Sequence, residues 1–232
     1  MTQTIRVITT VAMQGAIEAL AAEFHKTKGF DISMEFAPPS ATVEKVRAGE
    51  AADVVIATPE MIADLAREGK VDGATTRGVA RMVMGLAVGL NEPKPDISTV
   101  EGFKNALLQA KSVIHADPAT GSPSAAHFLK VVASLGIADD VARKTTTRSG
   151  LVAPAVASGE CAMAIQQLAE LKLVDGVHVL GPFPDSLQNV MPLSAAVHTG
   201  SKEPQAAKAL IDLMASPAAK SVMEKAGLLA AV

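Results

Sequence analysis

The chain has no tryptophan and no tyrosine, and it has only six phenylalanines among its 232 residues. Aromatic rings are the surfaces on which nucleic-acid bases and sugars stack. The scarcity of such rings therefore argues against ligands of both kinds. It favours a ligand that is small and polar.

Cysteine, basic charge and long apolar runs are also scarce. The single cysteine, Cys161, excludes an internal disulfide and leaves the cellular compartment open. We expect Cys161 to be a small buried residue and not a nucleophile. A net charge of -3 gives no support for a nucleic-acid partner. Apolar runs stay short of the roughly 18 residues that span a membrane, so the sequence predicts a soluble globular protein without membrane insertion.

Motifs for metals, nucleotide cofactors and serine nucleophiles are missing as well. The five histidines are dispersed, without the His or Cys spacing of a metal site. The chain contains neither G-x-G-x-x-G nor G-x-x-x-x-G-K, and it lacks the G-x-S-x-G elbow of serine hydrolases. We therefore expect no cofactor and no metal.

Strand-like and helix-like segments alternate along the whole chain, which is typical of α/β folds with mostly parallel sheets. The main expected strands are 5–10, 30–37, 54–58, 82–90, 112–116, 162–166, 177–180 and 190–198, and the main expected helices are 14–26, 59–68, 100–110, 123–135, 151–158, 204–215 and 217–226. A helix is also expected between residues 40 and 49.

Two similar stretches lie about 110 residues apart, A-G-E-A-A-D-V-V-I at 48–56 and S-G-E-C-A-M-A-I at 158–165. Each reads as a helix end, a Gly-Glu turn and a buried strand. The pair indicates two lobes built alike. Glycine ends helices in many folds, so the likeness also fits two ordinary helix ends.

The stretch A-D-P-A-T-G-S-P-S-A-A-H-F-L at 116–129 follows an apolar strand and leads into a helix. The unpaired N–H groups and dipole of a helix start accept an anion without a basic side chain. Thr120, Ser122 and Ser124 add hydroxyl groups, and Gly121 allows close approach of the backbone. The same residues also fit a plain helix entry, in which Ser122 or Ser124 only caps.

Segments throughout the chain resemble the type 2 periplasmic binding proteins, and among them the group around the molybdate-binding proteins of ABC transporters. They are T-T-V from 9, P-S-A-T from 39, R-A-G-E-A-A-D-V-V-I-A-T from 47, K-P-D-I-S-T-V from 94, D-P-A-T-G-S-P-S from 117, G-E-C-A-M-A-I-Q-Q-L-A-E-L from 159 and V-L-G-P-F-P from 179.

This resemblance implies two α/β lobes with a ligand cleft between them, two sheets flanked by helices, and crossover hinges near 81–85 and 190–193. Lobe 1 would comprise 1–82 plus 192–232, and lobe 2 would comprise 83–191. The expected function is capture of a small anion, with an ABC permease as partner. The protein itself is expected to be a monomer. The location is expected to be periplasmic if a leader was removed, and cytoplasmic if Met1 is the native start.

The resemblance places ligand binding on hydroxyl-bearing turns and a few neighbours: Thr9, Thr10, Val11, Ser40, Ala41, Thr58, Thr120, Gly121, Ser122, Ser124, Arg148, Ser149 and Gln166. The molybdate proteins have Ser where this chain has Thr10 and Val11, and Tyr where it has Gln166. Arg148 adds a charge that suits a carboxylate, so we expect an organic carboxylate rather than molybdate. Arg148 also fits a merely solvated charge. Whether Gln166 or Gln167 faces the ligand stays open, because strand neighbours point to opposite sides.

The segment G-E-x-x-x-x-I-Q-Q-x-x-E-L from 159 also resembles proteins related to aconitate isomerase, which implies an alternative function as an isomerase of a small unsaturated polycarboxylate. Such an enzyme would need a group that moves a proton between neighbouring carbons. His115, His127 and Glu170 are the candidates. Each also fits a structural role: a strand-end histidine, a residue of an amphipathic helix and an exposed helix residue.

Overall fold

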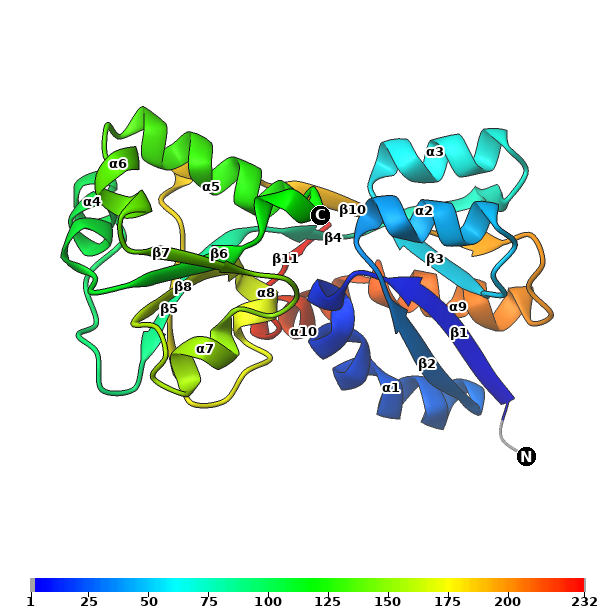
Figure 1. Cartoon of the computed structure of the whole chain (residues 1–232). Coiled ribbons are helices and arrows are strands. Elements are labelled where there is room, and N and C mark those ends of the chain that lie inside the picture. The colour runs from blue at the N-terminus through cyan, green and yellow to red at the C-terminus, as the bar shows by residue number, and fades with distance from the viewer. Residues whose placement is uncertain (1–2, 232) are drawn as a thin grey trace. The chain divides into compact units, whose positions relative to one another are not determined.

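The computed structural model describes residues 3–231, and the chain divides into two compact units. Unit 1 runs up to Met82 and resumes at Met191, and unit 2 is Val83–Val190 (Figure 1). The outer limits expected for lobe 1, residues 1 and 232, lie outside the described residues.

Unit 1 is built on a six-stranded sheet with the order β11-β4-β10-β3-β1-β2. The strands are β1 (Gln3–Thr9), β2 (Phe30–Phe36), β3 (Val54–Ala57), β4 (Val71–Met82), β10 (Met191–His198) and β11 (Leu229–Ala230). β1 pairs in parallel with both β2 and β3, whereas β10 is antiparallel to β3 and β4, and β11 is antiparallel to β4. Three parallel strands therefore lie side by side, with β1 in the middle.

Helices cover both faces of this sheet (Figure 1). α2 (Pro39–Arg47) and α3 (Pro59–Arg67) pack Val46 and Leu65 onto one face, against Val55 of β3. The other face carries α1 (Gln14–Lys28), which follows the short helix η1 (Val11–Met13), together with α9 (Pro204–Met214), η4 (Pro217–Ala219) and α10 (Lys220–Lys225). Proline in the first turn fixes the start of α2, α3 and α9.

Unit 2 contains a five-stranded sheet with the order β7-β6-β8-β5-β9. The strands are β5 (Met84–Gly89), β6 (Val113–Ala116), β7 (Thr145–Arg148), β8 (Met163–Gln167) and β9 (Val177–Pro182). β6 is parallel to β7 and β8, and β5 is antiparallel to β8 and β9. The parallel strands again lie side by side, with β6 between its two partners.

Two apolar cores hold the helices of unit 2 against this sheet. Phe103 and Phe128 belong to the core under α4 (Val100–Gln109), α5 (Pro123–Ser134) and α6 (Ala138–Ala142). Val156 and Leu171 belong to the core under α7 (Ala153–Ala157) and α8 (Leu168–Leu171). Two short helices, η2 (Pro118–Thr120) and η3 (Asp185–Leu187), lie in the connecting loops.

The predicted class, α/β with two sheets flanked by helices, is confirmed, but the expectation of mostly parallel sheets is wrong. Each sheet joins three parallel strands to antiparallel ones. β4 and β7 were not expected as strands. Both carry many exposed polar residues, so neither shows the apolar run or alternation by which a strand is recognised.

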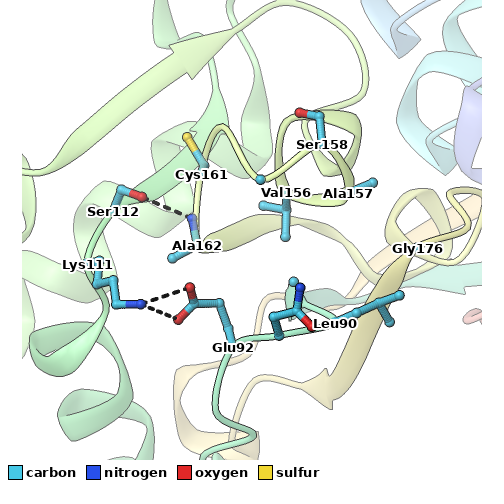
Figure 2. A pocket seen from close by; sticks show the side chains of 13 residues that line it. Leu90, Glu92, Lys111, Ser112, Val156, Ala157, Ser158, Cys161, Ala162 and Gly176 are labelled. Carbon is cyan, nitrogen blue, oxygen red and sulfur yellow. Dashed lines mark hydrogen bonds and ion pairs between the residues drawn. The ribbon is translucent and has the colours of Figure 1, made fainter.

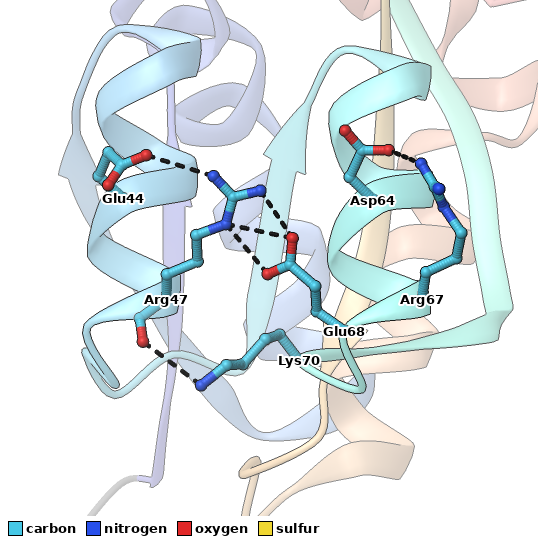
Figure 3. A network of polar contacts seen from close by, with 6 residues as sticks. All are labelled: Glu44, Arg47, Asp64, Arg67, Glu68 and Lys70. Atoms are coloured by element: carbon cyan, nitrogen blue, oxygen red, sulfur yellow. Dashed lines mark hydrogen bonds and ion pairs between the residues drawn. The ribbon is translucent and has the colours of Figure 1, made fainter.

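The motif R-A-G-E-A-A-D has a structural role that begins with Arg47. Its guanidinium binds both carboxylate oxygens of Glu68, with Nη2 2.6 Å from Oε1 and Nε 3.0 Å from Oε2 (Figure 3). Glu44 and Lys70 extend this network, Lys70 through the Arg47 carbonyl oxygen. The ion pair joins the C-terminal ends of α2 and α3. It therefore fixes two helices whose N-terminal ends begin at Pro39 and Pro59.

Asp53, the last residue of that motif, locks three segments of unit 1 together. Its Oδ2 accepts a hydrogen bond from the Arg6 N–H at 2.8 Å, and its Oδ1 accepts one from the Ser201 hydroxyl at 2.6 Å. The His198 N–H donates to the Asp53 carbonyl at 2.9 Å. Asp53 therefore sets the relative positions of β1, β3 and the end of β10.

We predict that Asp53→Ala lowers the free energy of unfolding by about 2–3 kcal/mol, because it removes two hydrogen bonds to a charged acceptor and leaves their donors unpaired. Urea denaturation measures this change. Asp175→Ala, at an exposed position of unit 2, is the matched control and should change stability by less than about 0.5 kcal/mol. Equal effects of the two substitutions would contradict the role of Asp53.

Candidate functional site

In unit 1 the ends of three parallel strands bring candidate ligand residues to one edge of the sheet. β1 ends at Thr9, and Thr10 precedes η1. β2 leads into α2, whose first turn contains Ser40, and Thr58 lies between β3 and α3. Because the three strands are neighbours, these segments share one edge of the sheet. The name unit 1 edge refers below to the candidate residues on it: Thr9, Thr10, Val11, Ser40, Ala41 and Thr58. Helix starts at such an edge offer N–H groups to a ligand.

Thr9 is the most unusual residue of the unit 1 edge. Its side chain is fully buried, and no partner for its Oγ1 is found within residues 3–231. A buried hydroxyl without a partner costs free energy, so such a group is expected to serve a ligand. Thr10 is also buried, whereas Ser40 is exposed and the Thr58 hydroxyl already caps α3 by accepting from the Met61 N–H.

Ser194 is a further polar residue at this edge that the sequence did not single out. It lies on β10 directly opposite Ala57, the last residue of β3, and it is only 6% exposed. A serine inside the apolar run M-P-L-S-A-A-V was the available signal. Its position beside the end of β3 makes it a candidate for ligand contact.

The second group of candidate residues lies where the parallel strands of unit 2 end. The name unit 2 edge refers below to residues 117–124, 148–152 and 166–167. These residues end or follow β6, β7 and β8. The Asp117 N–H donates to the Arg148 carbonyl at 3.0 Å, which joins the first two segments. Gly121 adopts a φ of 71°, a conformation that favours glycine, and thereby turns the chain into α5.

Most hydroxyl groups in the turn before α5 hold the turn itself. Thr120 Oγ1 donates to the Asp117 carbonyl at 2.6 Å, and Ser122 Oγ caps α5 by accepting from the Ala125 N–H. Ser124, 8% exposed, has its Oγ 2.9 Å from that of Ser122. The plain helix entry therefore accounts for Thr120 and Ser122, and Ser124 is the buried hydroxyl that could still contact a ligand.

Arg148 is engaged by a neighbouring carboxylate. Its Nη2 lies 2.8 Å from Oε2 and 3.1 Å from Oε1 of Glu160, and both side chains are partly exposed. This ion pair neutralises the charge on which the sequence argument for a carboxylate ligand rested. Ser149, the next residue, is exposed.

The two glutamines at the end of β8 have different surroundings. Gln166 is used by the protein itself: its Oε1 accepts from the Val152 N–H at 3.0 Å, and its Nε2 donates to the Gly150 carbonyl at 2.9 Å. Gln167 is 7% exposed, and its Oε1 has no partner among the described residues. Gln166 thus fixes the loop before α7, while Gln167 carries a buried polar atom that remains free for a ligand.

Glu170 on α8 has a strongly shifted carboxyl group. Burial raises the pKa of Glu170 to about 7, and hydrogen bonds from the Gln167 backbone and the Gln166 side chain oppose this rise. Both protonation states of Glu170 are therefore populated near neutral pH. Glu170 lies on α8, the short helix that begins directly after Gln167, the last residue of β8.

The two histidine candidates have structural contacts. His115 is 3% exposed, its Nδ1 lies 2.7 Å from the Ala116 carbonyl oxygen, and its ring packs edge-on against Phe128. Burial lowers the pKa of His115, which keeps its ring neutral at pH 7. The Nε2 of His127 lies 2.8 Å from the Leu187 carbonyl oxygen, so His127 holds the η3 loop to α5.

A cavity of about 410 Å³ lies elsewhere in unit 2 (Figure 2). Ser112 and Ala162, which precede β6 and β8, line it, so it lies at the opposite end of these strands from the unit 2 edge. Glu92 and Lys111 pair with each other across one wall at 3.1 Å. Cys161 also lines this cavity and is 5% exposed, which confirms the expectation of a buried cysteine.

Metal binding and membrane crossing find no support in the part of the chain that is described. Within residues 3–231, no three His, Cys, Asp or Glu side chains are grouped so that they could hold a metal ion. No helix in the same range has the length and apolar character needed to cross a membrane.

Comparison with known proteins places the fold and the sequence in one family. Residues 5–229 match the family described as bacterial extracellular solute-binding protein. The chain is 30% identical to an aconitate isomerase of Pseudomonas sp., over 97% of this chain and 87% of that protein. It is 23% identical to the molybdate-binding protein ModA of Escherichia coli K12, over 96% and 88% of the two chains.

Solved structures show the same fold. The periplasmic molybdate-binding protein of Azotobacter vinelandii superposes with a TM-score of 0.75 at 17% identity, covering 97% of this chain and 98% of that one. The expected resemblance to molybdate-binding-like periplasmic binding proteins is thereby confirmed. This chain belongs to the bacterial extracellular solute-binding protein family.

Proposed function

We propose that this solute-binding protein captures a small anion, and that an organic carboxylate is favoured over a molybdate-type oxyanion. One observation carries the proposal. Thr9 at the unit 1 edge and Gln167 at the unit 2 edge both end a strand with a buried polar atom that lacks a partner in residues 3–231. An anion oxygen can accept a hydrogen bond from the Thr9 hydroxyl, whereas Gln167 Oε1 is itself an acceptor and needs a hydroxyl or acid proton of a ligand.

Neutral donors are sufficient for such a ligand. Thr9, Thr10 and Ser124 are buried hydroxyl residues beside helix starts, where N–H groups and the helix dipole favour negative charge. Arg148, the one basic residue among the candidate ligand residues, is already paired with Glu160. The proposed site therefore selects its ligand by hydrogen bonding rather than by a free positive charge.

Two points support a carboxylate. The relative with 30% identity is named for aconitate, a polycarboxylate. The side-chain amide of Gln167 offers an acceptor as well as donors, and a ligand that carries a hydroxyl or acid proton can use both. A fully ionised oxyanion presents acceptors only, and so does fully ionised aconitate, so this point favours a carboxylate that also carries a hydroxyl, such as citrate. The preference no longer depends on Arg148.

We further propose that the protein works as a monomer outside the cytoplasmic membrane and passes its ligand to an ABC permease. The family description, extracellular solute binding, and the similarity to molybdate-binding proteins support the location and the permease partner. The segments 81–85 and 190–193, where the chain passes from one unit to the other, are the hinges that we propose.

A thermal-shift screen with cis-aconitate, trans-aconitate, citrate, sulfate, molybdate and tungstate tests the ligand class. We predict that one or more carboxylates raise the melting temperature, because a ligand at 100 times its Kd adds about 2.7 kcal/mol of stability. A shift with the metal oxyanions alone would contradict the carboxylate preference. A flat response to all six anions would contradict anion capture.

The substitution Thr9→Val tests the unit 1 edge. Valine keeps the shape and removes a buried hydroxyl without a partner, so the free energy of unfolding without ligand should stay the same or rise by up to about 1 kcal/mol. Affinity for the anion should nevertheless fall about tenfold, the loss of one net hydrogen bond. Urea denaturation and titration calorimetry measure the two quantities.

The control for this pair of measurements is Thr27→Val. Thr27 lies on the exposed side of α1 near its C-terminal end, far along the chain from the unit 1 edge. Its replacement should leave affinity unchanged. Unaltered affinity in Thr9→Val as well would show that the Thr9 hydroxyl does not contact the ligand.

A second candidate function is isomerisation of an unsaturated polycarboxylate, favoured by the Glu170 pKa of about 7 and the relative with 30% identity. A carboxyl group with this pKa can remove a proton from the CH2 carbon of aconitate and return one to the former alkene CH carbon, on the other side of the central carbon, so that the double bond moves and its geometry can change. If the protein is an isomerase, we predict that it interconverts cis- and trans-aconitate, which NMR would detect. We also predict that Glu170→Gln would abolish this turnover.

His115→Ala is the companion variant, because burial also shifts the pKa of His115. A rate that survives in Glu170→Gln but not in His115→Ala would move the proton-transfer role to His115. Aconitate that binds without any interconversion would exclude the isomerase function and leave solute capture intact.

A further inference from the structure

We infer that Gln188 is a positioning residue for ligand binding: its side-chain amide holds the backbone of Met84, and Met84 in turn fixes the side chain of Gln167. This inference rests on the proposed function, because Gln167 is a proposed ligand contact of the unit 2 edge. Gln188 lies between β9 and β10 and was not among the expected ligand residues.

The side-chain amide of Gln188 takes the place of a neighbouring strand beside Met84. Gln188 Oε1 accepts from the Met84 N–H at 2.8 Å, and Gln188 Nε2 donates to the Met84 carbonyl at 3.0 Å. The Phe183 N–H, directly after β9, donates to the same carbonyl at 3.0 Å. The Asn189 N–H also donates to Gln188 Oε1 at 3.0 Å, which orients the amide. One side chain therefore holds both polar backbone groups of Met84.

Met84 lies between Gln188 and Gln167. In the antiparallel ladder of β5 and β8, Met84 is directly opposite Gln167, and beside this pair the Leu168 N–H donates to the Val83 carbonyl at 2.8 Å. Because the N–H and carbonyl of Met84 bind Gln188, Met84 and Gln167 form a pair without mutual hydrogen bonds, in which side chains lie closest. A shift of the Met84 backbone therefore moves the side chain beside Gln167.

The Gln167 side chain depends on such packing. Opposite residues of a ladder point to the same face of the sheet, so Gln167 shares the face of Met84. Met84 is 1% exposed and belongs to the apolar core under α4, α5 and α6. Because Gln167 Oε1 has no partner among residues 3–231, no hydrogen bond fixes this oxygen. The packing of Met84 therefore sets where the oxygen points.

The loop that carries Gln188 is itself held firmly. The Nε2 of His127 on α5 lies 2.8 Å from the carbonyl oxygen of Leu187, the residue before Gln188. Phe183, at the start of the loop, is 1% exposed, and its ring centroid lies 4.6 Å from that of Phe103. These contacts give Gln188 a fixed position from which its amide can support Met84.

The substitution Gln188→Met tests the inference with citrate, whose hydroxyl can donate to Gln167 Oε1. Methionine has a similar length and lacks the amide. We expect the affinity for citrate, measured by titration calorimetry, to fall about fivefold, because Gln167 is no longer held in position for its hydrogen bond. Gln109→Met, at an exposed position of α4 in the same unit, should leave the affinity unchanged.

A double-mutant cycle assigns this loss to Gln167. When Gln167→Met is already present, we expect Gln188→Met to lower the affinity by less than about twofold, because the contact that Gln188 supports is then absent. A general structural role would lower the affinity by the same factor in both backgrounds. If Gln188→Met does not fold, Gln188→Asn, whose amide is one methylene shorter, takes its place in the cycle.

NMR of the ligand-free protein supplies a measurement that depends on no ligand. The side-chain amide signals of Gln167 should shift or broaden in Gln188→Met and stay in place in Gln109→Met. Unchanged signals overturn the inference, and so does an unaltered citrate affinity or an equal loss in both backgrounds. If no anion binds the unsubstituted protein, the proposed function fails, and the Gln167 signals still decide whether Gln188 positions Gln167.

Discussion

Parallel strands that end at a common edge bring the starts of the following helices together, and this constraint organises both units. In unit 1 it collects the segments after β1, β2 and β3, and in unit 2 those after β6, β7 and β8. Each edge gathers N–H groups and hydroxyls. A buried group of this kind that lacks a hydrogen-bond partner lowers the stability of the fold. The free side-chain atoms of Thr9 and Gln167 are the places where this need is unmet.

The remaining polar residues near these edges fix the geometry. Arg47 ties α2 to α3, Asp53 locks β1 and β3, and Gln166 holds the loop before α7. These contacts are satisfied within the protein, so a ligand does not need to pair with them. Within residues 3–231, the division between satisfied and unsatisfied polar groups separates Gln166 from Thr9 and Gln167; the third buried atom without a partner, Nε2 of His198, lies at the other end of β10 from Ser194.

The sequence predicted the α/β class and most strand and helix positions, because apolar periodicity and first-turn prolines report local structure. It missed β4 and β7, whose polar residues give no apolar pattern and whose pairing depends on distant strands. Alternation along β8 showed that Gln166 and Gln167 face opposite ways, but only the loop at 150–152 reveals which glutamine is already bound. Arg148 was singled out for its charge, and its partner Glu160 could not be identified from spacing.

Determination of the structure with trans-aconitate bound tests the central claim most directly. The account predicts a carboxylate oxygen of the ligand within about 2.7–3.2 Å of the Thr9 hydroxyl oxygen. A ligand seated instead in the cavity beside Glu92 and Lys111, with the Thr9 hydroxyl still lacking a partner, would contradict it.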